Sequence, residues 1–286
     1  MKKTLVVVAF VLAILLIFAP PVIGFFAQGQ IEAYVERSNA QTQAIGKTEI
    51  TSSERGWFNS QIHITTRFSE DYLAALNTAA EGAELDALLQ AGLQQEMNVS
   101  HGLLLFPDSG FTAGLATVDL VLDGQDNPNL QTLLNELQIP HFLAVQFVVP
   151  LAGSGPFTAT VPAFEYQHPE GLQFNFGGSK INGSANLLRG RVVGSGNIGT
   201  GKVAAADTNF SWQPWQVEFD QTYMDNSAFA AGTLAVTTPE MRAGNDTFDA
   251  TFTDLSFTGA TELDTPDTMG GTFAYDLDGF TVRNAP

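Results

Sequence analysis

The stretch that decides the fold is Leu172–Val203, with the sequence LQFNFGGSKINGSANLLRGRVVGSGNIGTGKV. It contains short runs of apolar and β-branched residues at Leu172–Phe176, Ile181–Leu187 and Arg189–Val193, separated by clusters of glycine and asparagine. Such clusters are typical of turns, and the runs between them have the length of strands. Strands that follow one another this closely leave no room for crossover helices, so the pattern predicts antiparallel pairing.

The same pattern continues on both sides of this stretch. Further strands are predicted by runs rich in Phe, Val and Thr at His141–Val149, Trp215–Phe219, Phe229–Thr237, Thr247–Leu255 and Gly271–Leu277. Upstream, alternating residues on both sides of Arg55-Gly56 predict two strands around a turn. The predicted fold class is therefore mainly β with minor α, an antiparallel β-meander sheet packed with two short helical segments.

The two helical segments are expected near residues 69–95 and 128–138. The first is rich in Ala, Leu, Glu and Gln, begins at the N-cap candidate Ser69, and predicts one broken helix or two short ones. The second follows Asn127-Pro128, an N-cap with proline at the first helical position, and stops before Pro140.

Residues 1–27 differ from the rest of the chain. Lys2 and Lys3 precede Thr4–Phe26, a run without a charged residue. A helix through this run would be roughly 34 Å long, enough to cross a hydrocarbon core of about 30 Å. A cleaved signal peptide is the alternative, but cleavage after Ala19 would place Pro20 at the first mature position. The sequence therefore predicts an N-terminal transmembrane helix at 1–27, an uncleaved signal anchor.

The two lysines also predict the topology, because positive charge holds that end of the segment in the cytoplasm. We expect a single-pass protein of the bacterial inner membrane with its C-terminal domain in the periplasm. A polar helical stalk is predicted at 28–46, where Ile31, Tyr34 and Val35 have helical spacing, followed by a mainly-β domain at 47–286.

Charge and cysteine content exclude several classes of partner and site. All 30 acidic residues but only 10 of the 12 basic ones follow the anchor, so the exported part has a net charge of 10 − 30 = −20. Such a surface repels phosphate backbones, so no nucleic acid partner is expected. The chain has no cysteine, which excludes thiolate zinc sites, Fe–S clusters and cysteine nucleophiles.

Three patterns resemble ligand sites but favour structural explanations. Gly194–Gly199 matches a dinucleotide-binding pattern, yet no helix follows it, so a glycine-rich hairpin bend is predicted. Asp123–Asn127, with Asp126 within it, and Asp276–Gly279, with Asp278 within it, lack EF-hand spacing and are predicted to be turns, with calcium binding as the alternative. The histidines have no paired spacing, and they are His63, His101, His141 and His168. No catalytic, cofactor-binding or metal-binding residue is predicted, and no cofactor.

The densest local signal is the segment from Arg55 to Ser60. Gly56 suits a turn, and Trp57 and Phe58 are predicted to be buried anchors of the core, so that truncating either to Ala would cost about 3–5 kcal/mol. A structural motif is therefore assigned to Arg55, Gly56, Trp57, Phe58 and Ser60.

This motif carries a resemblance to a known family. The chain resembles the YdgA-like family of uncharacterised bacterial envelope proteins, which begin with Met-Lys-Lys and a hydrophobic segment and contain an Arg-Gly-aromatic-Phe-Ser-Ser motif. Asn59 stands here in place of the first serine. His101-Gly102-Leu103 and Phe174–Gly178 also resemble family positions. The resemblance implies an inner-membrane anchor and a domain of unknown function, and it supplies no catalytic residues.

Taken together, the sequence predicts a membrane-anchored bacterial envelope protein that is not an enzyme. Its domain is expected to bind or scaffold an envelope protein or a lipid, with the inner membrane as the partner of its N-terminal helix. The alternative is the handling of a lipid or other apolar ligand in a β groove, because 22 phenylalanines could line one instead of filling a core. An enzyme based on paired carboxylates is the third hypothesis.

Overall fold

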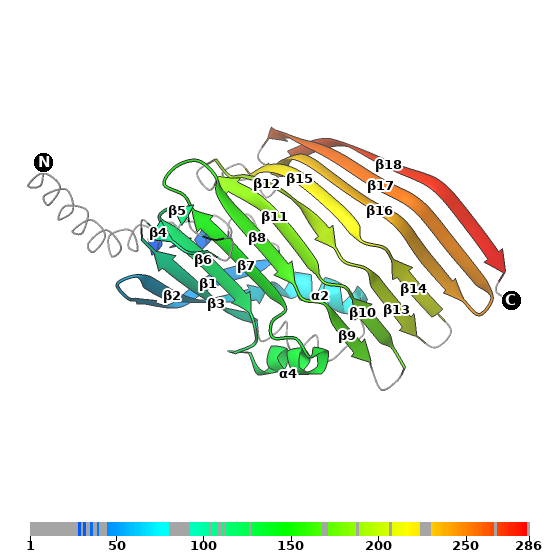
Figure 1. The fold of residues 1–286 in the computed structure, drawn as a ribbon, viewed down its shortest axis with the longest axis horizontal. Coiled ribbons are helices and arrows are strands. Elements are labelled where there is room, and N and C mark those ends of the chain that lie inside the picture. The colour runs from blue at the N-terminus through cyan, green and yellow to red at the C-terminus, as the bar shows by residue number, and fades with distance from the viewer. Residues whose placement is uncertain are drawn as a thin grey trace, which may run out of the picture. The chain divides into compact units, whose positions relative to one another are not determined.

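The computed structural model is mainly β and antiparallel (Figure 1). The structure describes residues 28–29, 31–32, 35–36, 39, 45–79, 92–102, 104–107, 110, 112–125, 127–167, 171–186, 189–205, 208–223, 230–265 and 268–284. The predicted anchor at 1–27 lies outside these residues. Among the helices that they form, none has both the length and the apolar content needed to cross a membrane.

The chain divides into two compact units. Unit 1 comprises residues 1–122 and 145–157, and unit 2 comprises residues 123–144 and 158–286. The division passes through two strands, β7 (Leu143–Val149) and β8 (Gly155–Val161).

Unit 1 is built on antiparallel strands in the order β1-β2-β3-β6. Its elements are β1 (Gly46–Arg55), β2 (Asn59–Phe68), α2 (Glu70–Ala79), β3 (Leu93–His101), β4 (Leu104–Leu105), β5 (Thr112–Ala113) and β6 (Ala116–Leu122). β4 and β5 form a separate two-stranded sheet. The helix near 69–95 was predicted too long, because Leu93–Gln95 lie in β3 and pair with β2; residues 80–91 lie outside the described part.

The core of unit 1 lies on one face of these strands. Alternate residues of β2 and β3 point the same way, and Ile62, Ile64, Met97 and Val99 form a buried cluster with Ala116. Ile31, from the segment predicted to be a stalk, packs against this cluster. The described residues between 28 and 39 are helical, so this segment is held on the sheet by its apolar side.

Unit 2 consists mainly of one antiparallel sheet, in the order β8-β11-β12-β15-β16-β14-β13-β10-β9, with β17 paired to β16 and β18 paired to β17. Its remaining elements are α4 (Pro128–Leu137), β9 (Phe164–Gln167), β10 (Gln173–Phe176), β11 (Ser179–Asn186), β12 (Arg191–Ile198), β13 (Gly201–Ala205), β14 (Thr208–Trp212), β15 (Trp215–Tyr223), β16 (Ala230–Asn245), β17 (Phe248–Thr265) and β18 (Thr268–Asn284).

The long strand β16 explains why this sheet is only partly a meander. Its first half pairs with β15 and its second half with β14, while its other edge pairs along most of its length with β17. The meander prediction is confirmed for β15 to β18, which follow one another in space as in sequence (Figure 1). The prediction is wrong for β12, which pairs with β15 and not with the next strand in sequence, β13. In the strand order, β13 and β14 lie beyond β16.

Helix α4 confirms the second helical prediction. The Asn127 side chain accepts a hydrogen bond from the Leu130 backbone N–H at 3.1 Å, and Pro128 occupies the first turn. Leu130, Leu134 and Leu137 form its buried side.

Candidate functional site

The candidate site of unit 2 is a strip of apolar side chains that crosses the sheet. Cross-strand partners in a sheet point to the same face, so the register aligns one residue from each of β9, β10, β13, β14, β16, β17 and β18 in a row. Two neighbouring rows make the strip, which we call the aromatic strip. The first row is Phe164, Phe176, Gly201, Trp212, Met241, Phe252 and Phe280, and the second is Tyr166, Phe174, Val203, Phe210, Ala243, Ala250 and Val282.

The rings of the strip touch one another. Phe164 lies 5.4 Å, between ring centroids, from both Phe174 and Phe176. Trp212 lies 6.4 Å from Phe174 and 5.6 Å from Phe210. These separations are those of favourable edge and offset contacts, so the rings form one continuous surface.

Gly201 leaves space for the ring of Trp212. A Cβ atom on Gly201 would overlap the ring of Trp212, so the indole lies directly over the glycine backbone. The indole N–H donates to the Gly199 carbonyl at 2.9 Å, which satisfies its polar atom and fixes its orientation. The indole N–H group of Trp212 is therefore not exposed on the strip.

The strip is neither buried like a core nor charged like a surface. Gly201 and Ala250 are its buried members, and at the β18 end Phe280 and Val282 are 57% and 54% exposed. No position in either row is charged, although residues 28–286 have a net charge of −20. More broadly, no phenylalanine among the described residues is fully buried, so these side chains do not simply fill a core.

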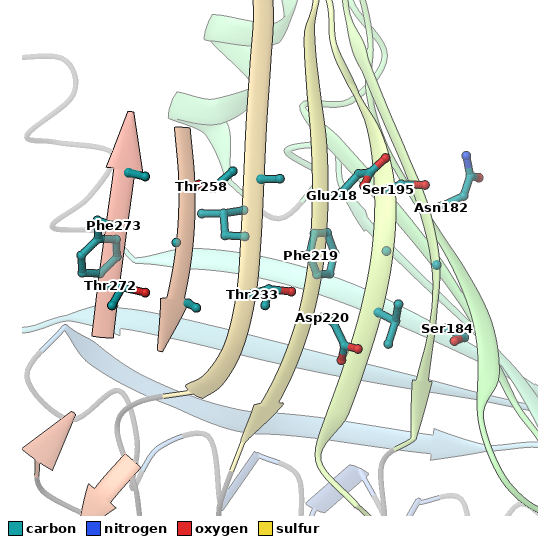
Figure 2. A pocket seen from close by; sticks show the side chains of 18 residues that line it. Asn182, Ser184, Ser195, Glu218, Phe219, Asp220, Thr233, Thr258, Thr272 and Phe273 are labelled. Atoms are coloured by element: carbon teal, nitrogen blue, oxygen red, sulfur yellow. The ribbon is translucent and has the colours of Figure 1, made fainter. Parts of the chain in front are cut away.

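A hollow of about 830 Å³ lies on the same sheet, across β11, β12, β15, β16, β17 and β18 (Figure 2). Its lining comes from three adjacent cross-strand rows. The two outer rows carry small and polar side chains, such as Ser184, Ser195, Thr233 and Thr258. The middle row, which includes Phe219, alternates with them and therefore points to the opposite face. The lining of the hollow combines these polar side chains with the apolar side chains of Phe219, Leu234 and Phe273.

The negative charge of Asp220, which lines this hollow, is neutralised by an ion pair with Arg191. Arg191 donates two hydrogen bonds to the Asp220 carboxylate, at 2.9 and 2.6 Å. The bond from Arg191 lowers the pKa of Asp220, and the same pair raises the pKa of Arg191. Both side chains are well exposed, so the pair orders the rim of the hollow and adds little stability.

The dinucleotide-like glycines have structural roles in this region. Gly194 and Gly196 lie inside β12, and Gly199 and Thr200 link β12 to β13, two strands that do not pair, so the predicted hairpin bend is wrong. A Cβ atom on Gly194 would lie 2.6 Å from the ring of its cross-strand partner Phe219, which packs over the glycine.

In unit 1, the structure places the Arg55–Ser60 motif at the turn between β1 and β2, as predicted. The Gly56 N–H donates to the Asn59 carbonyl at 2.7 Å, and the tight turn leaves a Cβ atom on Gly56 only 2.5 Å from Asn59 Oδ1. The predicted burial of the aromatic pair is wrong, because Trp57 is 49% and Phe58 57% exposed. The chain turns outward here before β2 reaches the core at Ile62.

The buried part of the motif is polar. Ser60 is buried, and its Oγ atom lies 3.2 Å from Nε2 of the buried His101, at the end of β3. The turn thus brings Ser60 close to His101, 41 residues later in the sequence, and the family resemblance includes both residues. Above them, Trp57 and Phe58 line a hollow of about 760 Å³ together with Leu104 and Phe106.

The acidic and histidine candidates are not brought together. Within the part of the chain that the structure describes, no three His, Asp or Glu side chains are close enough to hold a metal ion. Asp123 accepts a hydrogen bond from the Gln125 N–H at 3.1 Å, as a turn residue does. Asp276 and Asp278 lie within β18, so the predicted turn there is wrong. Asp126 and His168 lie outside the described residues.

The sequence analysis missed the aromatic strip, although a signal for it is present. Aromatic residues recur two positions apart at Phe164 and Tyr166, at Phe174 and Phe176, and at Phe210 and Trp212. In a strand this spacing places both rings on one face. Which of these pairs become neighbours depends on strand order, which the spacing does not reveal.

Comparison with known proteins finds one family. The family model described as "Bacterial protein of unknown function (DUF945)" matches residues 1–286. No curated protein and no solved structure matches the chain.

Proposed function

The chain belongs to this family of bacterial proteins of unknown function, and we propose that it is a non-catalytic binding protein that holds an extended apolar chain along the aromatic strip. A lipid acyl chain has the required chemistry. The observation that carries the proposal is an uncharged, partly exposed band of aromatic and aliphatic side chains in a strongly acidic protein.

The dimensions of the strip support an extended ligand. Neighbouring strands lie about 4.8 Å apart, so six spacings across seven strands give a band roughly 29 Å long. Two side-chain rows on one face are separated by about 6.7 Å along the strands. A band this long and narrow suits a flexible hydrocarbon chain better than a compact ligand.

The chemistry of the strip supports an apolar ligand. When an apolar ligand covers exposed apolar surface, each Å² removed from water contributes about 25 cal/mol to the free energy of binding. Met241, in the middle of the first row, is flexible and polarizable and adapts to ligands of different shape. A charged or strongly hydrated ligand would find no ionic partner in either row.

For the location, we propose the inner membrane, with the domain in the periplasm and residues 1–27 as the anchor. Lys2, Lys3 and the uncharged run Thr4–Phe26 support this topology. A protein held at the membrane would meet lipid chains directly. The resemblance to YdgA-like envelope proteins supports the same location.

The test compares lipid retention by matched variants of the full chain. Met241→Glu places a charge in the strip, while Thr237→Glu places the same charge at an exposed position of the same strand, outside the strip. Each protein is purified in detergent, and its bound lipid is measured by native mass spectrometry. Lipid around the anchor is common to both variants, so the difference between them reports on the strip.

We expect the wild type and Thr237→Glu to retain stoichiometric lipid and Met241→Glu to lose it. Val282→Glu, at the exposed β18 end of the strip, gives the same answer if Met241→Glu does not fold. Equal lipid in all variants would refute the proposal, and retention of an envelope protein in place of lipid would favour scaffolding.

A further inference from the structure

Unit 1 carries a second exposed apolar surface, separate from the aromatic strip. Trp57, Phe58, Leu104 and Phe106 are 49%, 57%, 48% and 79% exposed and line one hollow. We call these four residues the turn patch. They come from the β1–β2 turn and from the segment at β4, which the fold brings together.

The backbone beneath the turn patch is fixed by hydrogen bonds. The His101 N–H donates to the Phe58 carbonyl at 2.8 Å, and the Gly56 N–H donates to the Asn59 carbonyl. The Ser60 hydroxyl and the His101 ring meet in the buried layer below. These bonds fix the backbone of the turn from which the exposed Trp57 and Phe58 side chains project.

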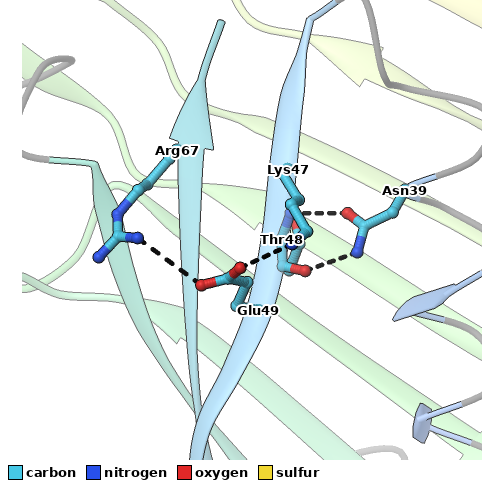
Figure 3. A network of polar contacts seen from close by, with 5 residues as sticks. All are labelled: Asn39, Lys47, Thr48, Glu49 and Arg67. Atoms are coloured by element: carbon cyan, nitrogen blue, oxygen red, sulfur yellow. Dashed lines mark hydrogen bonds and ion pairs between the residues drawn. The ribbon is translucent and has the colours of Figure 1, made fainter.

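The described residues between 28 and 39 show on which part of unit 1 this segment lies. The Asn39 side chain pairs with the backbone of Thr48, donating to its carbonyl and accepting from its N–H, each at 2.6 Å (Figure 3). Next to this pair, Glu49 accepts a hydrogen bond from Lys47 at 2.8 Å. Thr48 lies near the start of β1, at the end of the hairpin opposite the turn.

From Asn39 the helical segment runs back toward the turn. Ile31 packs on the core cluster, whose member Ile62 pairs with Ser53 in the half of the hairpin nearer the turn. Ile31 therefore lies nearer than Asn39 to the end of unit 1 that carries the turn patch.

We propose that the turn patch docks on the surface of the lipid bilayer in which residues 1–27 are anchored. This inference rests on the membrane location proposed above. Tryptophan favours the boundary between headgroups and acyl chains, which accommodates both its apolar ring and its polar N–H, and phenylalanine and leucine add apolar area that inserts there. Because the domain is strongly acidic, contact depends on inserted apolar area and not on attraction to anionic headgroups.

The chain has no cysteine, so a single introduced cysteine gives a unique site for a spin label. Phe106→Cys labels the turn patch, and Ile45→Cys is the control, at a 46% exposed position at the opposite end of the β1–β2 hairpin. The full chain is placed in nanodiscs of phosphatidylcholine. Spin relaxation by oxygen, which concentrates in lipid, is compared with relaxation by a water-soluble nickel chelate.

We expect the label at Phe106→Cys to be more accessible to oxygen than to the nickel chelate, and the label at Ile45→Cys to show the reverse. Phe58→Cys should match Phe106→Cys, which guards against a local effect of one substitution. Co-purification with the nanodisc but nickel accessibility at both patch positions would overturn this inference and leave the membrane location standing. A full chain that does not enter nanodiscs would contradict both.

Discussion

Truncation of Trp57 should destabilise unit 1 far less than truncation of Ile62, although both lie on the same hairpin. Ile62 is fully buried, and Ile62→Ala leaves a cavity that costs about 2–5 kcal/mol. Full burial of a large apolar side chain contributes about 1.5–3 kcal/mol, so Trp57, which is 49% exposed, contributes about 0.8–1.5 kcal/mol. Trp57→Ala should therefore cost less than Ile62→Ala, and less than half as much at the midpoints of these ranges.

Hydrogen exchange is the suitable assay, because the chain has two compact units that need not unfold together. The free energy of opening is read from the amides of β2 and β3, which pair beside Ile62. Equal losses in the two variants would refute the reasoning, since they would mean that Trp57 is buried in solution. A small loss in Trp57→Ala with reduced oxygen accessibility at the turn patch would agree with a docking role.

Three further predictions concern polar groups. Asn39→Ala removes two hydrogen bonds to Thr48 and should lower the opening free energy of β1 by about 1–3 kcal/mol; unchanged exchange there would show that the helical segment is not held by this pair. Arg191 lowers the pKa of Asp220, so the pair stabilises the fold above the ordinary Asp range and is lost as the pH falls through the lowered pKa. The melting temperature of Asp220→Asn should thus be below that of the wild type at neutral pH and equal to it in acid, and a gap that widens in acid would contradict this. Screening of the acidic surface should raise the melting temperature between low and molar sodium chloride, and a lower value in molar salt would mean that repulsion does not limit stability.

Local patterns predicted the elements of the fold better than their arrangement. The helix after Asn127-Pro128 was predicted correctly because its cap and its leucine spacing are local features. The strands at β16 and β17 extend well beyond the predicted runs, since cross-strand pairing continues through threonine, glycine and acidic residues. The pairing of β12 with β15 depends on long-range contacts that no local pattern carries.

The candidate sites were likewise predicted correctly only where they depend on adjacent residues. Gly56 and the turn after Arg55 were predicted because a tight turn is a property of a few adjacent residues. The exposure of Trp57 and Phe58 was predicted wrongly because aromatic residues are usually buried, and only the packing of the hairpin shows that this turn lies outside the core. The aromatic strip requires the register of seven strands, so it became visible only in the folded sheet.

The most direct test of binding at the aromatic strip is the fluorescence of Trp212 in the presence of a brominated fatty acid. Trp57→Phe and Trp215→Phe leave Trp212 as the single tryptophan, since the chain contains three. A bromine-bearing acyl chain on the strip should quench this residue saturably, and Met241→Glu should abolish the saturable part. Absent quenching, or quenching that rises linearly and equally in both proteins, would show that no acyl chain binds at Trp212.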